Sequence, residues 1–133
     1  MSAPDFTAGL APRQGASSLE IEAAERALGR PLPEDYRGFL RRSNGAEGFV
    51  GPDAYVMLWS TRELVELNEA YAVSEFAPGL VLVGTNGSDT GYGFIEMGGV
   101  PRYVRVPLIG LSVEAAEPIG QALGGLLARV RRS

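Results

Sequence analysis

Three residue types that carry much of enzyme chemistry are missing from this sequence. It has no cysteine, no histidine and no lysine, and its twelve basic residues are all arginine. The absence of cysteine excludes a disulfide framework, a thiolate zinc site and an iron–sulfur cluster. The absence of histidine removes the commonest general base and metal ligand, and the absence of lysine excludes Schiff-base chemistry and a lysine-containing phosphate loop. We therefore expect a protein that is not an enzyme and that holds no cofactor and no metal.

The residues that are present indicate one small globular domain. The chain has 133 residues, of which 45% are apolar and 21% charged, and its formal net charge is −4. This charge disfavours direct binding to nucleic acid and favours a basic partner. No apolar run approaches the eighteen or so residues of a membrane span, and the first fifteen residues lack the segments of a secretory signal. We expect a cytoplasmic protein with no membrane contact.

Local signals predict four helices, over residues 17–29, 33–45, 60–71 and 118–130. Ser17 with Glu20, and Ser60 with Glu63, have the spacing of a capping box, in which each side chain binds the other residue's backbone N–H. Gly29 suits the left-handed conformation that commonly ends a helix. Three glycines near the C-terminus weaken the last helix, each by up to about 1 kcal/mol relative to alanine.

Strand-like segments are predicted over residues 55–59, 80–83, 92–96 and 102–106. The last three are separated by the turn pairs Asn86-Gly87 and Gly98-Gly99, a pattern typical of an antiparallel meander. Helices beside a clustered antiparallel sheet make an α+β fold. We expect residues 1–16 to form an irregular N-terminal arm and residues 17–133 to form a single α+β domain.

Two features of the sequence could indicate phosphate binding or catalysis. The glycine-rich segment 84–93 follows a predicted strand, but it lacks the spacing of a phosphate-binding loop and leads into another strand, so a hairpin loop is the favoured interpretation. Paired carboxylates can run hydrolysis without histidine, which leaves Glu47, Asp53, Asp89 and Glu96 as candidates for a carboxylate-dependent hydrolase. No EF-hand spacing accompanies them.

The third predicted helix has an acidic surface. Leu64, Leu67 and Tyr71 form its apolar stripe, whereas its glutamates project elsewhere; the alternatives are a solvated face and a contact surface for a partner. Trp59, Tyr71 and Tyr92 are likewise either core residues or anchors for a partner, and core is the more common role for aromatics beside apolar runs.

The segment LGRPLPEDYRGFLRRSNGAEGF, residues 28–49, resembles the signature of the SUKH superfamily in its Smi/Knr cell-wall-regulator branch. The resemblance covers roughly residues 18–107. The matching elements are Leu28-Gly29, Leu32-Pro33 with Tyr36, Phe39-Leu40, Ser43-Asn44-Gly45 with Gly48-Phe49, Leu58-Trp59-Ser60, the segment 66–71 and the segment 83–87. The chain departs from the family pattern after Tyr92, where it reads Gly93-Phe94-Ile95-Glu96, and it lacks the expected aromatic residue in its last helix.

This resemblance implies a twisted, mainly antiparallel sheet flanked by helices, and in bacteria an immunity protein that binds and neutralises a cognate toxin, often a nuclease. Such a partner is expected to be a basic toxin domain. We expect the partner-binding residues to lie on loops and on the acidic helix, at Asp53, Glu66, Glu69, Asp89 and Tyr92. Two alternatives remain open at this point: an intracellular regulatory scaffold, as in fungal relatives, and the carboxylate-dependent hydrolase.

Overall fold

In the described part of the chain, six strands form a single antiparallel sheet in which each strand pairs with the next one in sequence. The computed structural model describes residues 7–132. Its helices are α1 (Ser18–Leu28), α2 (Glu34–Arg42), α3 (Thr61–Ala70), α4 (Val73–Phe76) and α5 (Leu123–Arg132). Its strands are β1 (Ala46–Phe49), β2 (Tyr55–Leu58), β3 (Val81–Thr85), β4 (Thr90–Met97), β5 (Val100–Pro107) and β6 (Glu117–Gly120). The predicted α+β fold is confirmed.

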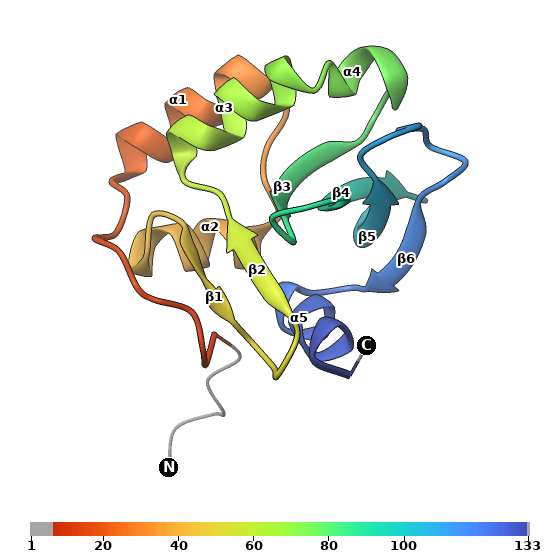
Figure 1. The fold of residues 1–133 in the computed structure, drawn as a ribbon. Helices are drawn as coiled ribbons and strands as arrows, with labels where there is room; N and C mark the ends of the chain where they lie inside the picture. Colours follow the sequence, from red (N-terminus) through yellow and green to blue (C-terminus); the bar gives the residue numbers. More distant parts are fainter. Residues whose placement is uncertain (1–6, 133) are drawn as a thin grey trace.

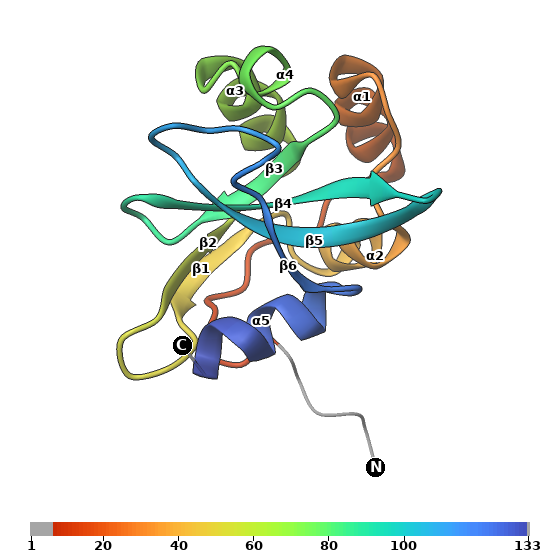
Figure 2. The ribbon, with the colours of Figure 1, turned by 90° about the vertical axis from the view of Figure 1, so that its right-hand side faces the viewer.

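The helices cover the twisted sheet on two sides (Figures 1 and 2). Helices α1, α3 and α4 lie together on one side, and α5 lies on the other (Figure 2). Helices α1 and α3 run side by side (Figure 1). No helix within residues 7–132 is long and apolar enough to cross a membrane.

Both predicted capping boxes are confirmed. The Glu20 N–H donates to the Ser17 hydroxyl oxygen at 3.1 Å, and the Ser17 N–H donates to the Glu20 carboxylate at 2.9 Å. Ser60 and Glu63 make the same two hydrogen bonds at the start of α3. Gly29 ends α1 with φ of 80°, as predicted. These helix boundaries follow from contacts between residues three apart in sequence.

Two sequence predictions at other elements are wrong. Residues 46–49, which lie between the second predicted helix and the first predicted strand and for which no strand is predicted, form β1, whose residues Ala46 and Phe49 pair with Leu58 and Tyr55. The final helix begins at Leu123 rather than Pro118, because residues 117–120 form β6 on the edge of β5. Short strands at sheet edges form because they pair with a neighbouring strand. Their own residues therefore predict them poorly.

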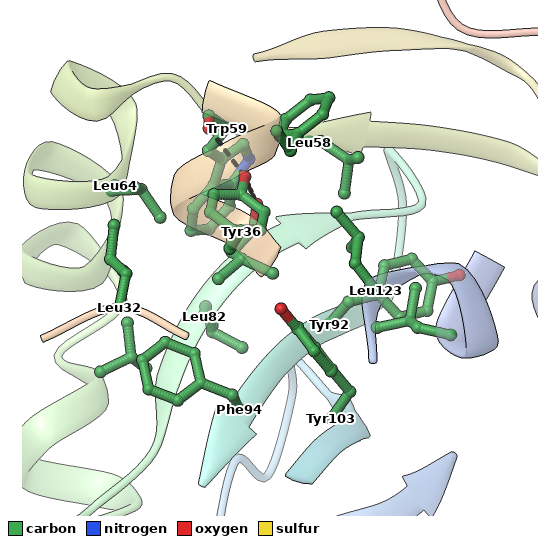
Figure 3. Packing of buried hydrophobic residues seen from close by; sticks show 14 of the residues in the cluster. Leu32, Tyr36, Leu58, Trp59, Leu64, Leu82, Tyr92, Phe94, Tyr103 and Leu123 are labelled. Atoms are coloured by element: carbon green, nitrogen blue, oxygen red, sulfur yellow. Dashed lines mark hydrogen bonds between the residues drawn. The ribbon is translucent and has the colours of Figure 1, made fainter. Parts of the chain in front are cut away.

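The core lies between the sheet and the helices and contains several aromatic side chains (Figure 3). Tyr36 from α2 and Tyr103 from β5 are fully buried. The Tyr36 hydroxyl lies 2.8 Å from the Trp59 carbonyl oxygen and 3.1 Å from that of Val83, and the Tyr103 hydroxyl donates to Asp35 at 2.9 Å. Burial raises the pKa of both phenols well above the usual range, so both stay protonated donors.

Residues 7–16 of the predicted arm are irregular, but they pack against the domain. Leu10 is buried, and the Ala11 N–H donates to the Glu47 carbonyl at 2.9 Å, which forms an isolated bridge beside β1. This segment covers the outer edge of β1, where unpaired backbone groups would otherwise be open to another chain. Residues 1–6 of the predicted arm lie outside the described residues.

Candidate functional site

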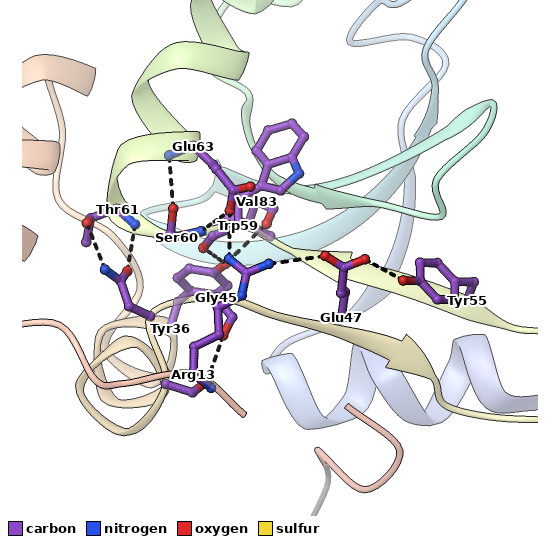
Figure 4. A network of polar contacts seen from close by, with 12 residues as sticks. Arg13, Tyr36, Gly45, Glu47, Tyr55, Trp59, Ser60, Thr61, Glu63 and Val83 are labelled. Carbon is purple, nitrogen blue, oxygen red and sulfur yellow. Dashed lines mark hydrogen bonds and ion pairs between the residues drawn. The ribbon is translucent and has the colours of Figure 1, made fainter. Parts of the chain in front are cut away.

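A polar network centred on Arg13 joins the N-terminal segment to β1 and α3 (Figure 4). The Arg13 guanidinium lies 3.2 Å from the Glu47 carboxylate and 3.1 Å from the Glu63 carboxylate. The Tyr55 hydroxyl donates to the other oxygen of Glu47. Burial alone would raise the pKa of Glu63, but hydrogen bonds from Ser60 and Arg13 outweigh it and lower that pKa. These partners therefore favour the ionised form of Glu63.

Two of the residues that carried the family resemblance, Asn44 and Gly45, lie at the same junction and have structural roles. The Asn44 side chain accepts a hydrogen bond from the Thr61 N–H at 2.8 Å, which fixes the end of α2 against the start of α3. A Cβ on Gly45 would lie 2.8 Å from the Ser60 nitrogen, so only glycine fits there. These residues build the fold and leave the partner surface to be sought elsewhere.

Three of the four carboxylates considered for hydrolysis are either engaged by structural partners or far from one another. Glu47 is engaged by Arg13 and Tyr55. Asp89 precedes β4 and Glu96 is near its far end, which separates them by roughly 23 Å at the usual rise of a strand. Among residues 7–132, no cluster of three metal-ligating side chains could hold an ion. The glycine-rich segment 84–93 forms the β3–β4 hairpin, as predicted.

The negative charge of the protein is concentrated on one helical layer. Helices α1, α3 and α4 together carry seven glutamates and two arginines, a formal charge of −5, whereas the rest of the 133-residue chain carries +1. We call the outward surface of these three helices the helical face. The seven glutamates are Glu20, Glu22, Glu25, Glu63, Glu66, Glu69 and Glu75.

Three of these seven glutamates have arginine partners, three have none, and the remaining one, Glu20, accepts the capping hydrogen bond from the Ser17 N–H. Glu25, Glu63 and Glu66 form ion pairs with Arg37, Arg13 and Arg62 at 3.5, 3.1 and 2.8 Å. Glu22, Glu69 and Glu75 form no ion pair with any residue in the range 7–132 and are exposed. Uncompensated surface charge of one sign raises the rate at which a partner of opposite charge associates.

A shallow groove runs along this face between α1 and α3. One depression lies between the N-terminal halves of the helices, with Ala23, Ala24 and Val65 as its apolar floor. A second, of about 250 Å³, lies between their C-terminal ends and shares Val65 with the first. Small side chains on α1 leave the groove open. The helical face therefore combines an apolar floor with an acidic surround, which suits it to binding another protein.

The structure separates the five residues predicted to bind a partner. Glu66 and Glu69 lie on the helical face. Asp53, in the β1–β2 loop, and Asp89, in the β3–β4 turn, lie in loops at one end of the sheet, on the left in Figure 2. Tyr92 is only 4% exposed and belongs to the core, so its inclusion as a contact residue is corrected.

The two other aromatic candidates form a stacked pair. Trp59 is buried, and its ring lies parallel to that of Tyr71 with centroids 6.3 Å apart. Tyr71 remains 37% exposed at the end of α3. The sequence interpretation missed the groove because its floor consists of alanines and ordinary aliphatic residues. Such residues are indistinguishable in sequence from an ordinary helix–helix contact.

Comparison with known proteins finds one matching family model and one similar bacterial protein. A family model described as SMI1 / KNR4 family (SUKH-1) matches residues 15–112, which is more than half of the chain. Over 90 residues the chain is 36% identical to the uncharacterised protein YnaB of Bacillus subtilis (strain 168). That match covers 60% of this chain and 58% of YnaB, so the chain spans less than two thirds of that relative's length.

Proposed function

Because this chain belongs to the SMI1/KNR4 (SUKH-1) family, we propose that it is an immunity protein that binds and neutralises a cognate bacterial toxin. It acts inside the producing cell and without chemistry of its own, by covering the toxin's active or substrate-binding surface. The expected toxin is of nuclease type, because a protein domain that binds nucleic acid is usually basic.

One observation carries this proposal beyond family membership: the helical layer has a charge of −5 in a chain whose remainder carries +1. A localised negative field accelerates encounter with a basic domain and orients it toward the helical face. Rapid association is what neutralisation of a toxin inside the cell requires.

The experiment is a growth-protection assay with the toxins encoded beside this gene. Each toxin domain is expressed in bacterial cells with and without this chain, and viable counts are compared. The proposal requires one neighbouring toxin to be lethal alone and harmless with this chain, and requires the two purified proteins to form a stable complex. Lack of protection against every neighbouring toxin refutes it.

The two alternatives make different predictions in the same experiments. A regulatory scaffold would have non-toxin genes as neighbours and would protect against none of the toxins. A carboxylate-dependent hydrolase would show turnover that disappears when one carboxylate is converted to its amide. Since the structure gives Glu47 two structural partners and separates Asp89 from Glu96, we favour the binding function.

A further inference from the structure

The C-terminal end of the groove on the helical face has an apolar floor and an acidic side chain at its rim. Its lining residues are Ala27, Leu28, Val65, Asn68, Glu69, Val73, Ser74, Leu80 and Val81, around a depression of about 250 Å³. The amide of Asn68 is occupied by hydrogen bonds to Leu64 and Leu82, so it is fixed in the wall. Glu69 is the charged residue of this lining, and its carboxylate forms no ion pair within residues 7–132.

The backbone adds to the negative potential at this place. The depression lies at the C-terminal ends of both α1 and α3. The other depression of the groove lies at both N-terminal ends, so the two helices run parallel. A helix carries partial negative charge at its C-terminus, and a basic side chain in the last turn normally compensates it. Helix α3 has no basic residue in its last turn and has Glu69 there.

The nearby arginines do not supply the missing compensation. Arg26, in the last turn of α1, lines a different depression together with Glu22 and Glu25. Arg30 donates to the Gly79 carbonyl oxygen at 2.7 Å. Arg62 lies at the opposite end of α3 and pairs with Glu66. A cation supplied by a partner would therefore compensate the negative charge at the C-terminus of α3.

We propose that this depression receives one arginine or lysine side chain from the partner protein. Its aliphatic stem packs on Ala27, Val65 and Val73, while its charged head reaches the Glu69 carboxylate. The occupant follows from charge complementarity, since the site combines a carboxylate with the C-terminus of α3, whose last turn has no basic residue. This inference rests on the proposed function, because the partner is the toxin domain, and it specifies which residue type that toxin presents.

The probe is the toxin domain encoded beside this gene, carrying an inactivating substitution in its active site. Its dissociation constant is measured by calorimetry with the wild-type chain, with Glu69→Gln and with Glu22→Gln. The two variants lose the same charge from exposed positions without ion pairs, but Glu22 lies outside the groove. We expect Glu69→Gln to weaken binding about 10- to 100-fold and Glu22→Gln to change it less than about 3-fold.

A second variant tests the depression itself. Ala27→Phe places a large side chain over the depression from an exposed helix position, so the melting temperature should change little while the complex weakens at least 10-fold. On the toxin side, alanine substitution of each arginine and lysine in turn should identify one residue whose loss has no further effect when Glu69→Gln is present.

The outcomes separate the two proposals. If the toxin binds and Glu69→Gln weakens binding no more than Glu22→Gln does, the depression is not the cation site, and the proposed function stands without it. If both variants bind normally and Ala27→Phe also has no effect, the groove lies outside the interface. If no neighbouring toxin binds the wild-type chain, both the proposed function and this inference fail.

Discussion

The side chain of Asn68 on α3 binds the backbone of Leu82 on β3 in the manner of a neighbouring strand. The Leu82 N–H donates to Asn68 Oδ1 at 2.9 Å, and Asn68 Nδ2 donates to the Leu82 carbonyl oxygen at 2.8 Å. Strand β2 pairs with β3 at Gly84 and Thr85, and the Trp59 N–H donates to the Val83 carbonyl oxygen at 2.8 Å before the chain turns into α3. One amide therefore continues the hydrogen bonding of the sheet and fixes the helix that carries Glu69 against it.

Replacing Asn68 with alanine should destabilise the protein by about 1–3 kcal/mol, because it leaves the Leu82 N–H and carbonyl without partners at a largely buried site. Urea denaturation followed by circular dichroism measures the change. Gln121→Ala is the control, since Gln121 is exposed and should cost less than about 0.5 kcal/mol. Equal stabilities of the two variants would contradict this role of Asn68.

Two glycines should respond in opposite ways to the same substitution. A Cβ on Gly84 would lie 2.2 Å from the Met57 carbonyl oxygen, so Gly84→Ala must push β2 and β3 apart and should lower the melting temperature strongly. Gly38 lies within α2, and a Cβ there meets no atom within 4 Å. Gly38→Ala should stabilise the protein by about 0.5–1 kcal/mol. Differential scanning calorimetry of both variants tests the pair.

The Glu63 ion pair should make stability depend on pH in the acid range. Because the folded state lowers the pKa of Glu63 below its ordinary 4.5, this residue contributes stability above that pH. The contribution is lost as the pH falls through the folded-state pKa. Glu63→Gln should therefore cost most near neutral pH and progressively less below about pH 4.5. Denaturation midpoints of both proteins between pH 7 and pH 3 measure this difference, and a constant difference across the range would refute it.

Association with the toxin should depend more on the helical face than on the loops at the sheet end. The double variant Glu66→Gln and Glu69→Gln should slow association at low salt several-fold, and the effect should shrink at high salt. The matched double variant Asp53→Asn and Asp89→Asn removes the same charge from the loops and should slow association less. Stopped-flow measurements at two ionic strengths decide which half of the predicted contact set is correct. A larger effect from the loop pair would move the interface to that end of the sheet.

The sequence by itself determined the parts of this protein that depend on neighbours along the chain. The Ser17–Glu20 and Ser60–Glu63 capping boxes were predictable because each joins residues three apart. The motif of residues 28–49 identified the family, since its residues make the turns and core contacts that define the fold.

Only the tertiary structure decided the elements and surfaces whose partners are distant in sequence. Helix α5 begins at Leu123 because its N–H donates to Asp35, 88 residues away, and β1 exists because β2 pairs with it. The same is true of the candidate site. The acidic residues of α1, α3 and α4 form one face only because these helices pack onto the same side of the sheet. The groove exists only because α1 lies beside α3, from which it is distant in sequence.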